Sequence, residues 1–311
     1  MNELPRAVTY RTEDDWLDSR RQFIGASESP ALMGEGYAGQ TPMSIWASKV
    51  HGLDMEIDPK VRKRLIAGRI AESSSLRIAQ AWTDIDIEAA DCPTVIVHPE
   101  HDFIRCTLDG WTSDDRVVEA KFCTVPKIFD QWADEGLPDR FIIQVQHQLA
   151  CTGWSRGMIV AVCPGNRDPI IQDVERHDEF IGKLVEYLRW WWDKFVIGRE
   201  TPPMDGDEKT KKLLHKLYGS GVELTCQRLG NLDELVDSYE ELGRKAREIE
   251  EERTRIGNQL RDAIGSCEYG VTSGGRTLSW KEVNRREFVM PASSSRQLRI
   301  VKALPRNVRF I

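Results

Sequence analysis

The sequence predicts an α+β protein with a long helix and a β-hairpin appended at its carboxyl-terminal side. Residues 1–204 mix helical and strand-like spacings of apolar side chains, with Gly and Pro between the segments. The polar stretch TPPMDGDEK at 201–209 then interrupts the apolar pattern. We therefore expect one domain over residues 1–204 and an appendage over residues 205–311.

The appendage begins with the spacing of a coiled-coil helix. Its seam recurs in alternating steps of four and three residues and is broken only by Arg253. The seam consists of Leu235, Tyr239, Leu242, Ala246, Ile249, Arg253, Ile256 and Leu260. The sequence GVTSGGRTLSW (270–280) follows and predicts two short strands around a Ser-Gly-Gly turn.

Composition excludes several classes of protein. The seven cysteines among 311 residues are scattered and form no CxxC pair, so neither a disulfide framework nor a zinc cluster is expected, and a reducing cytoplasm fits best. The amino terminus lacks a signal-peptide core, and no stretch approaches the roughly 20 apolar residues of a membrane span. We expect a soluble, cytoplasmic protein without a membrane partner.

The charge is unevenly distributed along the chain. A net charge of −7 argues against nonspecific coating of nucleic acid, but residues 270–311 hold nine Lys or Arg against two Glu. This basic tail could grip duplex phosphate, and it could equally be a solvated extension or a docking segment for a partner. The run of Trp190, Trp191 and Trp192 indicates core or a subunit interface more than a stacking platform for bases.

The segment HDFIRCTLDGWTSDDRVVEAKFC (101–123) combines strand patterns with carboxylates. An apolar strand ends at Asp109, a polar turn follows, and a second strand runs through 117–122. The two-residue period of a strand places Glu119 and Lys121 on the same face. Asp109 at the end of the neighbouring strand can lie beside Glu119, and two carboxylates with the Ala120 carbonyl suit a magnesium ion.

Such a group fits phosphodiester hydrolysis. A metal neutralises and polarises the phosphate and lowers the pKa of the attacking water, while Lys121 orients or deprotonates that water. A Glu and a Lys two residues apart are, taken alone, more often part of an ordinary surface hairpin. No G-x-x-x-x-G-K-[ST] phosphate loop is present, so ATP dependence is not expected.

Two helical segments flank this hairpin in the sequence. Glu72 is the acid of AGRIAESSSLRIAQAW, where it either positions the water or a second metal or is a solvated surface glutamate. In RFIIQVQHQLACTGW, Gln144, His147 and Gln148 share a face, opposite apolar residues. A glutamine there could hold Lys121 or a water, and the alternative is an ordinary polar helix face.

Taken together, these segments resemble the YqaJ-type viral recombinases, a family of phage lambda exonuclease-like and RecE-like nucleases of the PD-(D/E)xK superfamily. Four segments carry the resemblance in the family's order over residues 16–154: RRQFIGASESPALMG, AGRIAE, LDG with VVEAKFC, and QVQHQLACTGW. Leu108 stands where the family has a proline before its aspartate, a variation that leaves the site intact.

The resemblance implies a PD-(D/E)xK restriction-endonuclease-like core, with a central mixed sheet flanked by helices. It also implies one or two Mg²⁺ ions, replaceable by Mn²⁺, on Asp109, Glu119 and the Ala120 carbonyl, with Lys121 as catalytic lysine and Glu72 and Gln144 in support. Ser27 and Arg20 match positions near the terminal 5' phosphate of DNA. Arg21 is adjacent, and a shift of one residue would exchange the two arginines.

We therefore expect a magnesium-dependent, ATP-independent 5'-to-3' double-stranded DNA exonuclease, encoded by a phage or prophage and active in the bacterial cytoplasm. It would make 3' overhangs for annealing recombination. The partners that the family implies are DNA ends, further copies of the chain in a ring, and a phage single-strand annealing protein. An endonuclease on the same fold and a non-catalytic DNA-binding accessory protein are the alternatives, and the sequence does not specify the role of the carboxyl-terminal helix and tail.

Overall fold

The structure is a computed structural model and describes residues 4–37, 40–54, 58–219, 221–284, 298–305 and 307–310. The chain divides into two compact units, Met1–Gly219 and Ser220–Ile311. This boundary lies later than the one expected at 204/205, because helix α8 (Glu208–Tyr218) still packs against α3 (Pro42–His51) in the first unit. Leu213 of α8 is 1% exposed as a result.

The first unit contains a five-stranded sheet with the order β3-β6-β7-β8-β9. Its strands are β3 (Ile87–Glu88), β6 (Gly110–Thr112), β7 (Arg116–Phe122), β8 (Arg156–Val162) and β9 (Ile170–Glu175). The central pair β7 and β8 is parallel, and the other pairs are antiparallel. The expected mixed sheet is therefore present, with the predicted Glu-Ala-Lys strand at its centre.

A second sheet of four strands has the order β1-β4-β5-β2. Its strands are β1 (Ala7–Thr9), β4 (Thr94–Val97), β5 (Ile104–Thr107) and β2 (Ile24–Gly25). The chain passes from this sheet into the five-stranded sheet between β5 and β6. The apolar strand expected to run to Asp109 thus ends earlier, and Asp109 lies in the crossing between the sheets.

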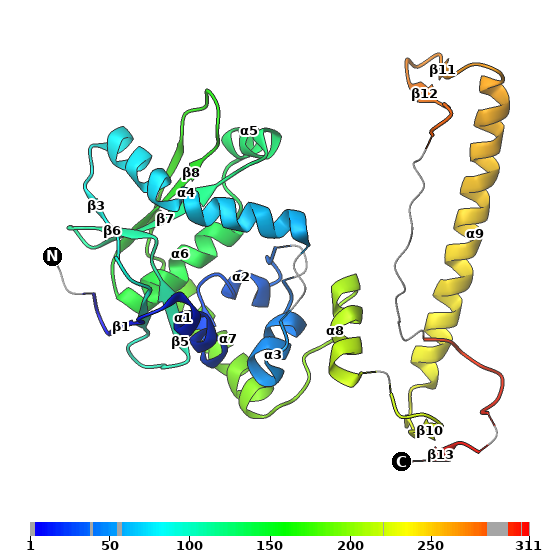
Figure 1. The fold of residues 1–311 in the computed structure, drawn as a ribbon, viewed down its shortest axis with the longest axis horizontal. Coiled ribbons are helices and arrows are strands. Elements are labelled where there is room, and N and C mark those ends of the chain that lie inside the picture. Colours follow the sequence, from blue (N-terminus) through cyan, green and yellow to red (C-terminus); the bar gives the residue numbers. More distant parts are fainter. Residues whose placement is uncertain are drawn as a thin grey trace. The chain divides into compact units, whose positions relative to one another are not determined.

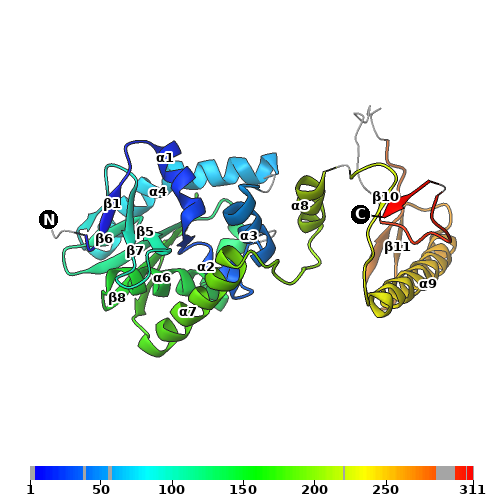
Figure 2. The same cartoon turned by 90° about the horizontal axis from the view of Figure 1, so that it is seen from below.

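Helices cover the sheets and connect their strands (Figures 1 and 2). They are α1 (Glu13–Ser19), the 3-10 turn η1 (Arg20–Gln22), α2 (Ser29–Leu32), α3, α4 (Pro59–Thr83), α5 (Pro126–Glu135), α6 (Asp139–Thr152), α7 (Asp178–Trp191) and the π-helical turn η2 (Trp192–Ile197). Local signals fix several starts: Thr41 and Ser44 form a capping box at α3, and the Asp58 side chain accepts the Lys60 N–H at α4.

The two faces of β7 pack against different helices. Val117 belongs to the larger buried cluster, together with Val145 and Leu149 of α6. Val118 belongs to a smaller cluster with Leu76 of α4. The strand therefore alternates as its sequence predicts, and it lies between α6 on one face and α4 on the other.

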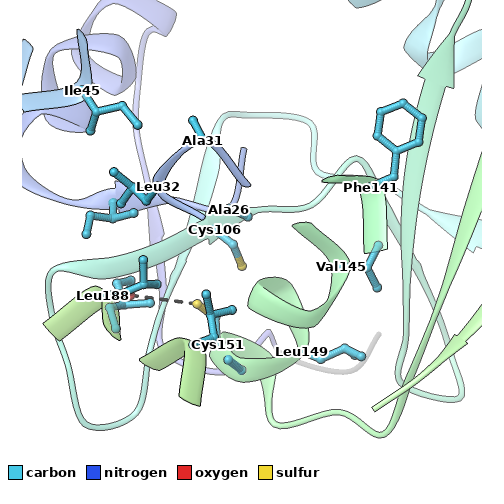
Figure 3. Close-up of a cluster of buried hydrophobic side chains, with 14 of the residues drawn as sticks. Ala26, Ala31, Leu32, Ile45, Cys106, Phe141, Val145, Leu149, Cys151 and Leu188 are labelled. Carbon is cyan, nitrogen blue, oxygen red and sulfur yellow. Dashed lines mark hydrogen bonds between the residues drawn. The ribbon is translucent and has the colours of Figure 1, made fainter. Parts of the chain in front are cut away.

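The larger cluster is the main core of the first unit (Figure 3). Apolar residues of α6, labelled in Figure 3 as Phe141, Val145 and Leu149, are 1% exposed or less. The tryptophan run contributes to the same core, since Trp191 and Trp192 are 1% and 8% exposed, while Trp190 is 48% exposed. The sequence favoured core or a subunit interface for these tryptophans, and Trp191 and Trp192 lie in the core.

The second unit has the long helix and the hairpin that the sequence predicts. Its elements are β10 (Thr225–Cys226), which pairs in parallel with β13 (Arg309–Phe310), α9 (Asp233–Ile264), and the antiparallel pair β11 (Tyr269–Val271) and β12 (Thr277–Ser279). No residue of α9 is buried in the described part of the chain, so its heptad seam is exposed. Four arginines of the basic tail lie outside the described residues: Arg285, Arg286, Arg296 and Arg306.

No described helix combines the length and the apolar character needed to cross a membrane.

Candidate active site

Asp109 is held at the crossing between the two sheets by its neighbours in the chain. Gly110 permits the crossing, because a Cβ there would lie 2.8 Å from Ile87 Cγ2 and 3.0 Å from the Glu88 carbonyl oxygen. The Asp109 Oδ2 atom accepts the backbone N–H of Ala120 at 2.8 Å. This bond ties the carboxylate to the strand that carries Glu119.

Glu119 and Lys121 lie on the α6 face of β7, as the strand period predicts. Glu119 is 2% exposed, and its Oε1 atom accepts a hydrogen bond from the Lys121 ammonium. The ammonium also lies 5.0 Å from the centre of the Phe141 ring. A buried carboxylate, a lysine and an aromatic ring therefore meet beside Asp109.

Helix α6 supplies two glutamines to the same carboxylate. Gln144 donates to Glu119 Oε1 at 2.7 Å and accepts from Lys121 Nζ at 3.0 Å. Gln148 donates to Glu119 Oε2 at 2.6 Å. Gln144 thus makes the contacts needed to hold Lys121 in place. Gln148 is a further contact of Glu119 that was not among the site residues expected from the sequence, although the helical period placed it on the same face as Gln144.

The face of α6 that was alternatively expected to be an ordinary polar surface is buried. Gln148 and His147 are both 0% exposed. His147 contacts the Ser29 hydroxyl at 2.6 Å through Nδ1 and the Arg105 carbonyl at 3.0 Å through Nε2. Both ring nitrogens are used in joining α6 to α2 and β5, so His147 is a structural residue here.

Glu72 on α4 is half-buried and lines a cleft of about 480 Å³. Asp109, Gln144, Ser27 and Arg20 line the same cleft. This position favours a role for Glu72 at the site over an ordinary surface glutamate. Five of the candidate site residues converge on one cavity from α4, α6, the crossing between the sheets and the amino-terminal segment.

The electrostatics of the site reflect three carboxylates around one ammonium. Burial raises the pKa of Asp109 well above its usual range, and the charges of Glu119 and Glu72 raise it further. Burial and Glu119 likewise raise the pKa of Glu72. Burial alone would lower the pKa of Lys121, but the charges of Glu119, Tyr37 and Asp109 and the hydrogen bond to Glu119 together outweigh it, and the pKa is raised. The site is short of positive charge, which a bound cation would supply.

The donors that could hold such a cation are oxygens. Asp109 and Glu119 offer carboxylates and Ala120 offers a backbone carbonyl, which suits Mg²⁺, an ion that takes one or two carboxylates and keeps several waters. Within the described ranges, no three His, Cys, Asp or Glu side chains are grouped to hold a metal by themselves. Because the donors named here are all oxygens, they fit a hydrated hard cation better than a zinc ion.

Arg20 and Ser27 meet at another part of the cleft. Arg20 Nη2 donates to Ser27 Oγ at 3.1 Å, and the guanidinium carbon lies 5.4 Å from the Trp16 ring centre. The adjacent Arg21 instead pairs with Asp54 at 3.3 Å. The structure therefore brings Arg20, and not Arg21, beside Ser27.

Comparison with known proteins shows similarity in sequence and in fold. Residues 15–155 match the family model of the YqaJ-like viral recombinase domain. The chain is 24% identical over 281 residues to a Bacillus subtilis (strain 168) protein named "Uncharacterized protein YqaJ", a match that covers 88% of this chain and 84% of the relative.

Solved structures are similar in fold. The alkaline exonuclease LHK-Exo of Laribacter hongkongensis superposes with a TM-score of 0.50 at 19% identity, covering 66% of this chain and 99% of that chain. Its complex with dAMP gives a TM-score of 0.50 at 18% identity with the same coverage. The expected α+β core with a central mixed sheet flanked by helices is confirmed, and its fold is similar to that of the alkaline exonuclease. Residues 15–155 are similar to the YqaJ-like viral recombinase domain, the family that the sequence motifs indicate.

Proposed function

We propose that the protein is a magnesium-dependent, ATP-independent deoxyribonuclease that degrades one strand of duplex DNA in the 5'-to-3' direction. The observation that carries the proposal is the contact of the Lys121 ammonium with Glu119 and Gln144, close to Asp109, which lines an open cleft together with Gln144. The family and the fold support it. The fold neighbour is named an alkaline exonuclease and was crystallised with dAMP, a product expected of strand degradation.

The roles of the residues follow from their positions. Bound to Asp109, Glu119 and the Ala120 carbonyl, one or two Mg²⁺ or Mn²⁺ ions would neutralise the scissile phosphate and lower the pKa of a water molecule. Lys121 would donate to that water or to the phosphate and oppose the charge that develops. Gln144 holds Lys121 in place beside Glu119.

Glu72 is suited to proton transfer. Burial raises the pKa of its carboxyl group, which makes the ionised group a better proton acceptor than an ordinary surface glutamate. It shares the cleft with Asp109. Glu72 would therefore accept the proton of the attacking water while Asp109 holds the cation.

Arg20 and Ser27 could bind the terminal phosphate of DNA, which would explain why cleavage begins at DNA ends. A terminal 5' phosphate carries more negative charge than an internal diester, and a guanidinium with a hydroxyl donor suits it. Capture of that phosphate in the cleft would place the first diester near the carboxylates and set the 5'-to-3' direction. The 3' overhangs, the ring of identical subunits and the single-strand annealing partner are part of the proposal and rest on the family alone.

Digestion of labelled DNA tests the proposal. Linear duplex with 5' phosphates is incubated with Mg²⁺ or EDTA, beside a covalently closed circle and a duplex labelled at either end of one strand. We expect magnesium-dependent loss of the linear duplex from its 5' ends with the circle intact. Cutting of the circle would replace the exonuclease with an endonuclease, and no cutting with any divalent metal would favour the accessory protein.

A further inference from the structure

The short segment from Arg20 to Glu28 carries both residues of the candidate phosphate site. It consists of η1, β2 and the turn into α2, so no long element holds it in place. Arg20 begins the segment, Ser27 lies near its end, and their side chains meet at 3.1 Å. Whatever fixes the two ends of the segment therefore decides where both side chains point.

A buried ion pair joins these ends. Lys49 of α3 donates from Nζ to both carboxylate oxygens of Glu28, each at 2.8 Å, and to the backbone carbonyl of Arg20 at 2.6 Å. Glu28 Oε2 also accepts the N–H of Gly25 at 2.8 Å, and the Glu28 N–H donates to the Gly25 carbonyl at 2.9 Å. One ammonium group thus connects the first residue of the segment to the last.

The pair is buried more deeply than an ordinary surface ion pair. The side chains of Lys49 and Glu28 are 1% and 12% exposed. Well-packed apolar residues of the same volume are often at least as stable as a buried ion pair, so stability alone gives no reason for one. What the ion pair adds is a fixed geometry. The three N–H groups of the Lys49 ammonium have three acceptors, so the Arg20 carbonyl and the Glu28 carboxylate cannot shift independently of each other.

The pair also leaves the charge of Arg20 available. A Cβ on Gly25 would lie 3.6 Å from Arg20 Nη2 and 3.5 Å from Glu28 Oε2, so the guanidinium and the carboxylate approach the same glycine. Lys49 occupies both oxygens of Glu28, and Arg20 donates to the neutral Ser27 hydroxyl. A guanidinium that faces a neutral hydroxyl keeps its charge for an incoming anion.

We propose that Glu28 and Lys49 are positioning residues, whose ion pair holds Arg20 and Ser27 in the orientation that receives a 5'-terminal phosphate and prevents Glu28 from neutralising Arg20. The inference rests on the proposed function, since the phosphate is that of a DNA end. Neither residue touches the reacting atoms. Their loss should therefore remove the preference for phosphorylated ends and leave the Glu119 and Lys121 contacts unchanged.

The test measures binding without cleavage. Affinities for a short duplex with 5' phosphate and for the same duplex with 5' hydroxyl are measured in EDTA by fluorescence anisotropy. The variants are Lys49→Met and the double variant Glu28→Gln/Lys49→Met, which removes both charges at similar volume and leaves no unpaired carboxylate. Lys183→Met is the control, because Lys183 forms an exposed ion pair with Glu179 on α7.

Wild type and Lys183→Met should bind the 5'-phosphorylated duplex more tightly than the 5'-hydroxyl duplex. In the two Lys49 variants, the ratio of these two affinities should fall about tenfold. An unchanged preference in the folded double variant, checked by its thermal unfolding, would overturn the inference. So would the absence of any preference in wild type. A wild type that prefers phosphorylated ends but cuts no DNA with Mg²⁺ would refute the proposed nuclease and leave the positioning role standing.

Discussion

Three side chains donate hydrogen bonds to the Glu119 carboxylate. Lys121 is two residues away in the sequence, Gln144 is 25 and Gln148 is 29. These donors leave the carboxylate little freedom to rotate. A cation that binds Glu119 would therefore meet oxygens that already point in fixed directions, and loss of one donor should weaken its binding.

Gln148→Leu removes one of these donors without touching Lys121. We expect it to raise the Mg²⁺ concentration needed for half-maximal cleavage about tenfold, as is common when a residue supporting a metal ligand is lost. Titration of cleavage with Mg²⁺ measures this. Gln146→Leu is the control, since Gln146 bonds the Glu175 carbonyl and the His177 N–H away from the site. Equal Mg²⁺ dependence in Gln148→Leu and wild type would argue against the support role.

His98 predicts a pH dependence of stability. Burial, together with the neighbouring charges of His101, His147 and Arg6, lowers its pKa from 6.5 to about 4. The unfolded chain therefore binds the proton more tightly, so the stability that His98 contributes is present above pH 6.5 and is lost as pH falls toward 4. Urea midpoints at pH 7 and pH 5 should differ less in His98→Gln than in wild type. The same difference in both proteins would contradict this assignment.

At the scale of elements, the distance between α6 and the five-stranded sheet decides whether the two glutamines reach Glu119. Gly157 of β8 sets this distance, because a Cβ there would lie 2.6 Å from Val145 Cγ1 and 3.4 Å from the Val117 carbonyl oxygen. A side chain at residue 157 would push α6 away from the sheet. The glutamines on α6 would move with it.

Gly157→Ala should therefore lower the free energy of unfolding by about 1–3 kcal/mol and reduce cleavage as well. Gly182→Ala on α7 is the matched control, since nothing lies within 4 Å of its added Cβ. Because alanine favours helix, that control should gain about 0.5–1 kcal/mol. Urea unfolding of the two variants measures both effects. Equal stability of the two variants would contradict this account, because it would mean that α6 can move away from the sheet at no cost in free energy.

At the scale of the whole molecule, every candidate site residue lies in the unit Met1–Gly219. The second unit, Ser220–Ile311, contains the exposed helix α9 and the basic tail. We therefore expect a chain shortened to residues 1–219 to release the first nucleotide of a 5'-phosphorylated duplex at the rate of the full chain. Single-turnover digestion measures this. A folded but inactive short chain would place a catalytic contribution in the second unit.

The alternation of Val118, Glu119, Ala120 and Lys121 could be predicted from the sequence, because it depends only on the period of a strand. The burial of His147 could not, since it depends on contacts with Ser29 and Arg105, 118 and 42 residues away. Contacts between α3 and the Arg20–Glu28 segment escaped prediction for the same reason.

The late boundary between the units has a similar cause. The stretch at 201–209 has the composition of a linker, and only the packing of the following helix α8 onto α3 shows that the first unit continues. Composition reports local polarity, whereas a domain boundary depends on which distant residues an element contacts.

The measurement that most directly tests the catalytic assignment is digestion of 5'-phosphorylated linear duplex with Mg²⁺ by Lys121→Ala, beside Lys127→Ala as an exposed-lysine control on α5. Lys121→Ala should cut at least about 10²-fold more slowly while binding the duplex as wild type does, and Lys127→Ala should cut normally. Cleavage by a folded Lys121→Ala at the wild-type rate would contradict the assignment of this lysine and its carboxylates as the catalytic centre.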